Sequence, residues 1–230
     1  LMEFFGLTLL DLQLELSEFP QIILNIEQEE LHITAGLQDR VIQTYGGIVH
    51  MDFTNLSFST ETTIKKKSHL PNYKHGTYTI IDKSLLPKLY LAYNIDEGSD
   101  SGKVHSTVKM RYLNGDIDVI NGMKEIGNLA DEAKECLFTN NMIRLGELMN
   151  RNFELRRQLY GDEAVGKKNI KIHKLANDLG FAAKFTGSGG AFLCLLKSGD
   201  GWILNEEIEE LVREQFNKEG FEFIRIESLV

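Results

Sequence analysis

A glycine-rich loop between two short apolar runs is the feature that most restricts the fold of this chain. The loop, TGSGG at residues 186–190, follows AAKF and precedes AFLCLL. A dinucleotide-binding turn needs the spacing G-x-G-x-x-G and a helix directly after it. Here a run of strand type follows the loop, so the pattern predicts a β-hairpin with strands at 182–186 and 190–197 and excludes a Rossmann fold.

This loop has two interpretations. Glycine adopts positive φ and lets a ligand approach the backbone, but in a regular element it costs roughly 1 kcal/mol relative to alanine. Successive N–H groups, together with the hydroxyls of Thr186 and Ser188, could cradle an anion. An ordinary tight hairpin explains the same residues, and the loop sequence alone leaves both interpretations open.

The remaining patterns predict an α+β fold, because strands are mixed with grouped helices. A helix expected over 20–30 has Pro20 in its first turn, where proline is tolerated. Helices are also expected at 4–17, 37–45, within 103–179 and at 205–220, and strands after Gly47 and at 77–82, 88–94 and 221–227. The aperiodic stretch 54–76 is the candidate boundary, which gives domains 1–58 and 76–230 and a linker at 59–75.

Charge and composition narrow the function classes. The net charge of -9, from 25 Lys+Arg and 34 Asp+Glu, argues against a general nucleic-acid or anionic-membrane binder. The opening LMEFFGLTLL is too short to span a bilayer. Cys136 and Cys194 lie far apart with no secretory leader, which favours a reducing cytoplasm over a disulfide framework or a Cys-ligated zinc site. Because the net charge of the chain is negative, an anionic ligand must bind at a local cluster of positive charge.

Two further segments contain residues that could bind a ligand or take part in a reaction. GSDSGKV at 98–104 is one spacer residue short of a Walker A loop and has Val104 where that loop needs Ser or Thr. The segment 98–104 predicts the start of a helix. Lys103 would lie near the N-terminus of this helix, where an anion is favoured. Alternatively, the segment is only a helix cap followed by a solvated lysine. GLQDR likewise starts a helix, and its Asp39 is either a cap or a reactive carboxylate. The histidines show no transition-metal spacing.

Three separated segments together resemble the second half of the GHMP family of small-molecule kinases: EQEELHITAGLQDRVIQTYGGIVHMDF, LGELMNRNFELRR and AKFTGSGGAFLCLL. Within that family, GLQDRVIQTYGGIVHMDF, SDSGKVHSTV and LMNRNFELRRQLYGDE most resemble the glucuronokinase branch. The similarity runs over nearly the whole chain. It implies the remainder of an N-terminal domain like ribosomal protein S5 domain 2, followed by a ferredoxin-like C-terminal domain, with ATP and sugar bound between them.

The resemblance also implies an activity: ATP- and Mg²⁺-dependent phosphorylation of the anomeric hydroxyl of D-glucuronate. Phosphorylation of another sugar, such as a heptose phosphate, fucose or galactose, and non-catalytic binding of a sugar or a partner stay open as alternatives. By its match to the family's G-x-x-D segment, Asp39 would be the catalytic base, and Glu27 matches a glutamate that helps to hold Mg²⁺.

The resemblance also implies residues that bind the sugar and residues that bind the phosphates. Gln38, Arg40 and Lys103 are the candidates for substrate binding, and Lys184 is a further candidate for the sugar carboxylate or the phosphates. The positions expected to approach the ATP phosphates are Thr186, Gly187, Ser188, Gly189 and Gly190.

The family's phosphate loop, P-x-x-x-G-L-S-S-S-A, is expected upstream of Leu1. We therefore expect this chain to be a piece of the kinase that is inactive by itself. Its uncovered apolar surface is expected around Phe4, Phe5, Leu9 and Leu10. The residues give no indication of the oligomeric state.

Overall fold

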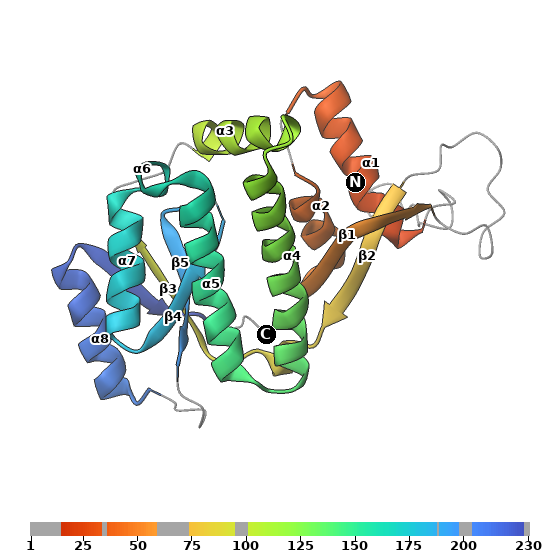
Figure 1. Cartoon of the computed structure of the whole chain (residues 1–230). Coiled ribbons are helices and arrows are strands. Elements are labelled where there is room, and N and C mark those ends of the chain that lie inside the picture. Colours follow the sequence, from red (N-terminus) through yellow and green to blue (C-terminus); the bar gives the residue numbers. More distant parts are fainter. Residues whose placement is uncertain are drawn as a thin grey trace. The chain divides into compact units, whose positions relative to one another are not determined.

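The computed structural model describes residues 15–33, 36–58, 74–94, 101–187, 189–197 and 204–227. The chain divides into two compact units, Leu1–Ser84 and Leu85–Val230, whose elements are labelled in Figure 1. The expected first helix up to residue 14, the apolar patch within it, and Ser188 lie outside the described residues.

The described part of the first unit begins with a continuous helical segment. Its parts are η1 (Leu16–Glu18), α1 (Phe19–Asn25) and the π-helical η2 (Ile26–Glu30). Pro20 occupies the start of α1, where its missing N–H costs nothing, so the helix expected over 20–30 is confirmed. Helix α2 (Leu37–Tyr45) has its predicted bounds. It ends at Gly46, whose φ of 65° favours glycine.

Two long strands complete this unit, and the boundary between the two units lies after the second strand. Strand β1 (Ile48–Phe58) pairs antiparallel with β2 (Lys74–Ile81), with a register shift between Asp52 and Ser57. The first unit therefore runs to Ser84, and the division does not fall at 59–75 as the sequence predicts. The prediction placed a boundary in the aperiodic stretch 59–75, but this stretch joins two strands that pair in one sheet.

The second unit is built on a four-stranded antiparallel sheet in the order β4-β5-β3-β6. The strands lie where the sequence predicts: β3 (Leu89–Asn94), β4 (Phe181–Phe185), β5 (Ala191–Leu196) and β6 (Phe221–Arg225). The helices are α3 (Ser101–Leu113), α4 (Ile117–Phe138), α5 (Met142–Tyr160), α6 (Asp162–Val165), α7 (Lys167–Asp178) and α8 (Glu206–Lys218). The α+β prediction is confirmed. In the described part of the chain, no helix has the length and apolar composition of a membrane span.

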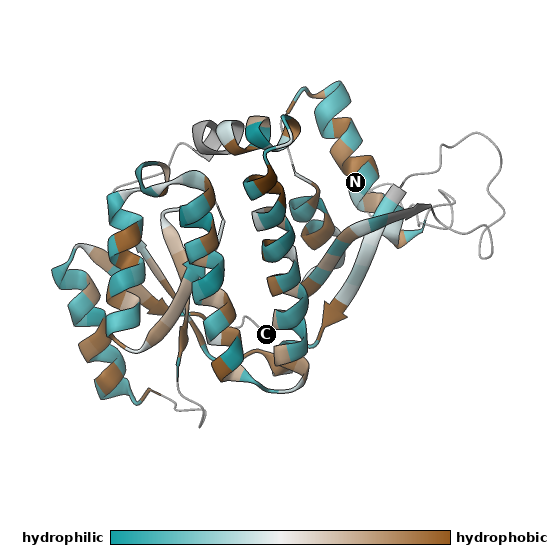
Figure 2. Ribbon diagram, in the orientation of Figure 1, coloured by the Kyte–Doolittle hydropathy of each residue, from teal (hydrophilic) through white to brown (hydrophobic). Residues whose placement is uncertain are grey.

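Helices and strands of this unit enclose an aromatic core. Helices α5 and α7 pack on β4, and α8 packs on β6 (Figure 1). Figure 2 shows hydrophobic residues interspersed with hydrophilic ones along α7 and α8, as expected for helices with one buried face. The ring of Phe223 stacks between Tyr90 and Phe216, at centroid distances of 5.0 and 4.7 Å. This core fixes the hairpin that carries the glycine-rich loop.

Candidate functional site

The first candidate group is the carboxylate at the start of α2. Asp39 lies in the first turn of this helix and is exposed, where the positive end of the helix favours a negative charge. It makes no hydrogen bond or ion pair with any residue that the structure describes. Gly36, the N-cap, has open space beside it, since a Cβ there would meet no atom within 4 Å. An exposed, unpaired carboxylate next to open space is suited to accept a proton from a ligand.

An ion pair brings Glu27 and Arg40 together. Nε of Arg40 donates to Oε2 of Glu27 at 2.5 Å, and the two side chains are only 21% (Glu27) and 13% (Arg40) exposed. The pair ties η2 to α2 and leaves the remaining N–H donors of the guanidinium for other partners. Gln38 is exposed on the same helix turn. The structure thus links two of the predicted site residues directly, and Asp39 is the chain neighbour of one of them.

Glu27 fits Mg²⁺ only as a single protein ligand. Mg²⁺ is usually held by one or two carboxylates together with waters and substrate phosphates, so one glutamate is compatible with it. One oxygen of Glu27 already accepts from Arg40. Across the described ranges, no group of three or more His, Cys, Asp or Glu residues could hold a metal ion. Any metal would therefore depend on ligand oxygens as well as on Glu27.

The second candidate region is the hairpin loop between β4 and β5, in the second unit. Gly189 and Gly190 have φ values of 147° and 79°, which L side chains rarely adopt. Two helices hold the loop in place: Nη1 of Arg156 donates to the Gly187 carbonyl at 2.7 Å, and Oδ1 of Asn169 accepts from the Gly190 N–H at 3.0 Å. The Gly190 N–H, like the Thr186 N–H that donates to the Ala191 carbonyl at 3.2 Å, is therefore occupied internally and is not available to an anion.

Arg156 and Asn169 are site residues that the sequence analysis missed. Arg156 lies 31 positions before the residue that it contacts, and Asn169 lies 21 positions before its partner. No spacing rule reaches that far along a chain. The one available signal is that Arg156 belongs to the segment LMNRNFELRRQLYGDE, which carries the family resemblance. Lys103, in the first turn of α3, has no described side chain.

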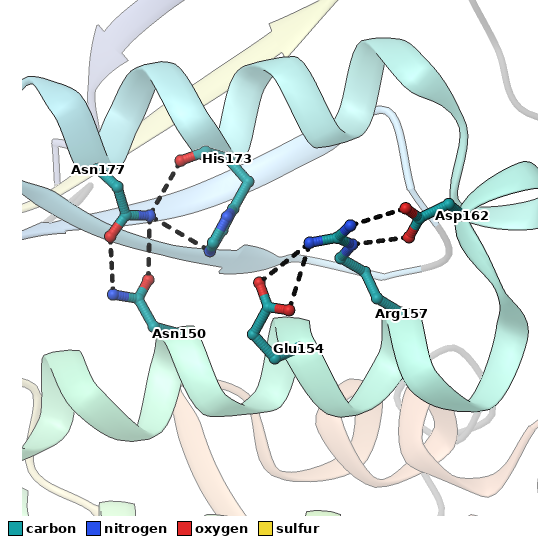
Figure 3. Close-up of polar contacts among 6 residues, drawn as sticks. All are labelled: Asn150, Glu154, Arg157, Asp162, His173 and Asn177. Atoms are coloured by element: carbon teal, nitrogen blue, oxygen red, sulfur yellow. Dashed lines mark hydrogen bonds and ion pairs between the residues drawn. The ribbon is translucent and has the colours of Figure 1, made fainter.

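A polar network fixes α5 and α7 to the hairpin (Figure 3). Oδ1 of Asn150 accepts from the Ala183 N–H of β4 at 3.0 Å, and Nδ2 of Asn150 donates to Oδ1 of Asn177 at 2.9 Å. Nδ2 of Asn177 donates to the carbonyl of His173 at 2.9 Å and also lies 3.3 Å from its Nε2. The network therefore orients both helices against strand β4, whose last residue leads into the loop.

The environment of His173 in this network predicts that the folded chain loses stability in acid. Burial, followed by the charges of Arg157 and Lys197, lowers the pKa of His173 from 6.5 to about 4. Between these two pKa values the unfolded chain binds the proton more tightly than the folded one, so stability present above pH 6.5 is lost as the pH falls toward 4. We expect His173→Gln to flatten this loss, measured as the denaturation midpoint in guanidinium from pH 7 to pH 4.

The matched control for this prediction is His32→Asn. His32 is exposed and has a φ of 54°, which asparagine tolerates. The control should keep the pH dependence of the wild type. If His173→Gln and wild type lost stability in parallel from pH 7 to pH 4, His173 would not be the group responsible.

Comparison with known proteins finds similarity to small-molecule kinases. Residues 133–220, from within α4 to the end of α8, match the family model of GHMP kinases C terminal. The chain is 45% identical over 202 residues to glucuronokinase 1 of Arabidopsis thaliana, and 46% identical over 203 residues to probable glucuronokinase 2 of the same organism. Each alignment covers 88% of this chain and 50% of the relative, so the chain spans about half the length of the curated relatives it matches.

A solved structure agrees at the level of the fold. Phosphomevalonate kinase of Streptococcus pneumoniae has a TM-score of 0.68 and 13% identity, over 98% of this chain and 66% of that chain. The family match lies within the second unit, and the structural likeness extends over 98% of the chain. Over residues 133–220 the chain is therefore similar to GHMP kinases, and its α+β architecture is the GHMP kinase fold.

Proposed function

We propose that the whole protein is an ATP-dependent sugar-1-kinase that phosphorylates the anomeric hydroxyl of D-glucuronate. The observation that carries this proposal is the 45% identity to glucuronokinase 1 over 88% of the chain. The exposed carboxylate of Asp39 beside the open space at Gly36 supports it, because anomeric phosphorylation needs a base within reach of the sugar hydroxyl.

Each candidate residue has a role in this reaction. Asp39 accepts the proton of the anomeric hydroxyl, whose oxygen attacks the γ-phosphorus of ATP in line with the leaving ADP oxygen. Arg40, oriented by Glu27, presents its free N–H donors to the sugar carboxylate, a planar group that guanidinium matches well. Gln38 offers an amide to sugar hydroxyls.

We assign the phosphates to the glycine-rich loop and to Lys103. Glycines at 187, 189 and 190 allow phosphate oxygens to approach the backbone, and we include Thr186, Ser188 and Lys103 among the candidate contacts. Mg²⁺, held by Glu27 together with the phosphates, would neutralise part of the charge of ATP. The buried, free thiols of Cys136 and Cys194 are consistent with a reducing compartment, and we propose the cytoplasm.

A comparison of sugars tests this function. D-glucuronate and D-glucose differ only in the carboxylate, so the whole protein should show a kcat/KM for glucuronate at least about tenfold above that for glucose, since a charge-assisted contact is worth roughly 1.5–3 kcal/mol. Galactose, fucose and a heptose phosphate complete the panel. A higher kcat/KM for one of those three would reassign the substrate, and sugar binding without turnover of any of them would make the protein a non-catalytic binder.

A further inference from the structure

Both edge strands of the four-stranded sheet are bound by a helix side chain at their middle residue. Strands β4 and β6 lie at the two ends of the order β4-β5-β3-β6. At β4, the N–H of Ala183 donates to Oδ1 of Asn150 on α5 at 3.0 Å. At β6, the carbonyl of Phe223 accepts from Nε of Arg213 on α8 at 3.3 Å. Each edge is therefore capped by a helix that packs on it.

The hydrogen-bond pattern of β6 shows that the Phe223 carbonyl faces the outer edge. The Ile226 N–H donates to the Leu89 carbonyl, at the start of β3, at 2.9 Å. Bonded residues alternate along an antiparallel strand, so Ile224 also bonds toward β3, and the backbone groups of Phe223 and Arg225 point away from it. Outward N–H and C=O groups of this kind are a template for pairing with another strand.

The side chain of Arg213 is fixed where it meets this edge. A groove of about 460 Å³ lies between α8 and β6, and the described residues that line it belong to these two elements, apart from Glu227. Within it, Nη2 of Arg213 donates to Oε1 of Glu209 at 3.4 Å, and Nη1 donates to Glu210. Because two carboxylates orient the guanidinium, Arg213 loses little further side-chain freedom by also binding the Phe223 carbonyl.

A second copy of β6 is the partner that would fit this edge if it were uncovered. Ile224 and Ile226 are 40% and 43% exposed on one face of the strand. Antiparallel pairing centred on Ile224 would place the two Ile224 side chains opposite each other. It would also match the outward backbone groups of Phe223 with those of Arg225. In this register, no two side chains of like charge lie opposite each other between residues 221 and 227.

We propose that Arg213 keeps the outer edge of β6 closed to a second copy of this chain. Its bond to Phe223 occupies an acceptor that the partner strand needs, and pairing would force the guanidinium out of its contacts with Glu209 and Glu210. Natural sheets use charged side chains at edge strands in the same sense, to prevent edge-to-edge association. The proposal lies outside the kinase reaction, so its test does not depend on turnover.

Arg213→Met tests this role, because methionine keeps an apolar stem but cannot donate to a carbonyl. Sedimentation equilibrium of the full chain should give a dimer dissociation constant about tenfold or more below that of the wild type. Lys218→Met, which removes one exposed positive charge from the last turn of the same helix, is the control and should associate like the wild type. Arg213→Lys keeps the charge without the planar fork and should fall between the wild type and Arg213→Met.

A double variant and hydrogen exchange identify the surface that associates. In Arg213→Met with Ile224→Lys, two lysines would face each other across the pairing, so this protein should associate no more tightly than the wild type. In Arg213→Met alone, exchange of the Phe223 and Arg225 amides should slow as the protein concentration rises, and in the wild type it should not.

Three results would overturn the inference. The first is an unchanged dissociation constant in both Arg213→Met and Arg213→Lys. The second is association of Arg213→Met that persists when Ile224→Lys is added, since the contact would then lie elsewhere. The third is the same concentration-dependent protection of the Phe223 and Arg225 amides in the wild type, which would show that Arg213 does not close the edge.

Discussion

Asp39→Asn in the whole protein is expected to slow phosphoryl transfer by about 10²-fold or more and to leave the affinity for ATP nearly unchanged. Asparagine has almost the same shape as aspartate but cannot accept the proton of the sugar hydroxyl. The side chain is exposed and unpaired among the described residues, so the substitution breaks no described contact and should not affect folding. Steady-state kcat and a separate measurement of ATP binding check the two parts of this prediction.

The control for Asp39 is Asp82→Asn. Asp82 is another exposed carboxylate of the first unit, and its Oδ1 accepts from the Ser84 N–H. An asparagine there keeps an acceptor oxygen and should retain wild-type turnover. Near wild-type kcat in Asp39→Asn would remove this residue from the mechanism, and equal losses in both variants would point to a general effect of charge.

Phe153→Ala is expected to cost about 3–5 kcal/mol of the free energy of unfolding of the second unit. The Phe153 side chain is 0% exposed. Its ring centroid lies 3.7 Å from that of His173 and 5.3 Å from that of Phe185, at the end of β4. Removing the ring leaves a cavity between α5, α7 and the hairpin, which the packed helices can close only in part.

Hydrogen exchange during a urea titration measures this loss. The amides of β4 and β5 report on the second unit directly, which matters because the chain has two compact units and need not unfold in one step. Phe138→Ala is the matched control: this ring is 49% exposed at the end of α4 and its removal should cost under about 1 kcal/mol. Similar losses in the two variants would show that Phe153 does not hold the hairpin.

Local patterns predicted the elements that carry the candidate site. Glycines bound α2 at Gly36 and Gly46, and the apolar runs on either side of the glycine-rich loop form β4 and β5. These features depend on neighbouring residues, for which periodicity and turn chemistry are informative.

Contacts between distant parts of the chain could not be predicted in this way. The pairing of β2 with β1 crosses a stretch without periodicity. The bond from Arg156 to Gly187 exists because α5 packs on β4. The Glu27 and Arg40 ion pair depends on how η2 meets α2, so two residues predicted to bind ligands separately turn out to be partners.

The proposed reaction transfers phosphate from ATP to the anomeric oxygen of glucuronate. The most direct test incubates the whole protein with D-glucuronate, ATP and Mg²⁺ and examines the product by ¹H–³¹P correlation NMR. We predict a single sugar phosphate in which the phosphorus couples to the anomeric proton, and no such product from Asp39→Asn in the same time. A phosphate on any other hydroxyl, or ATP hydrolysis without a sugar phosphate, would contradict the account.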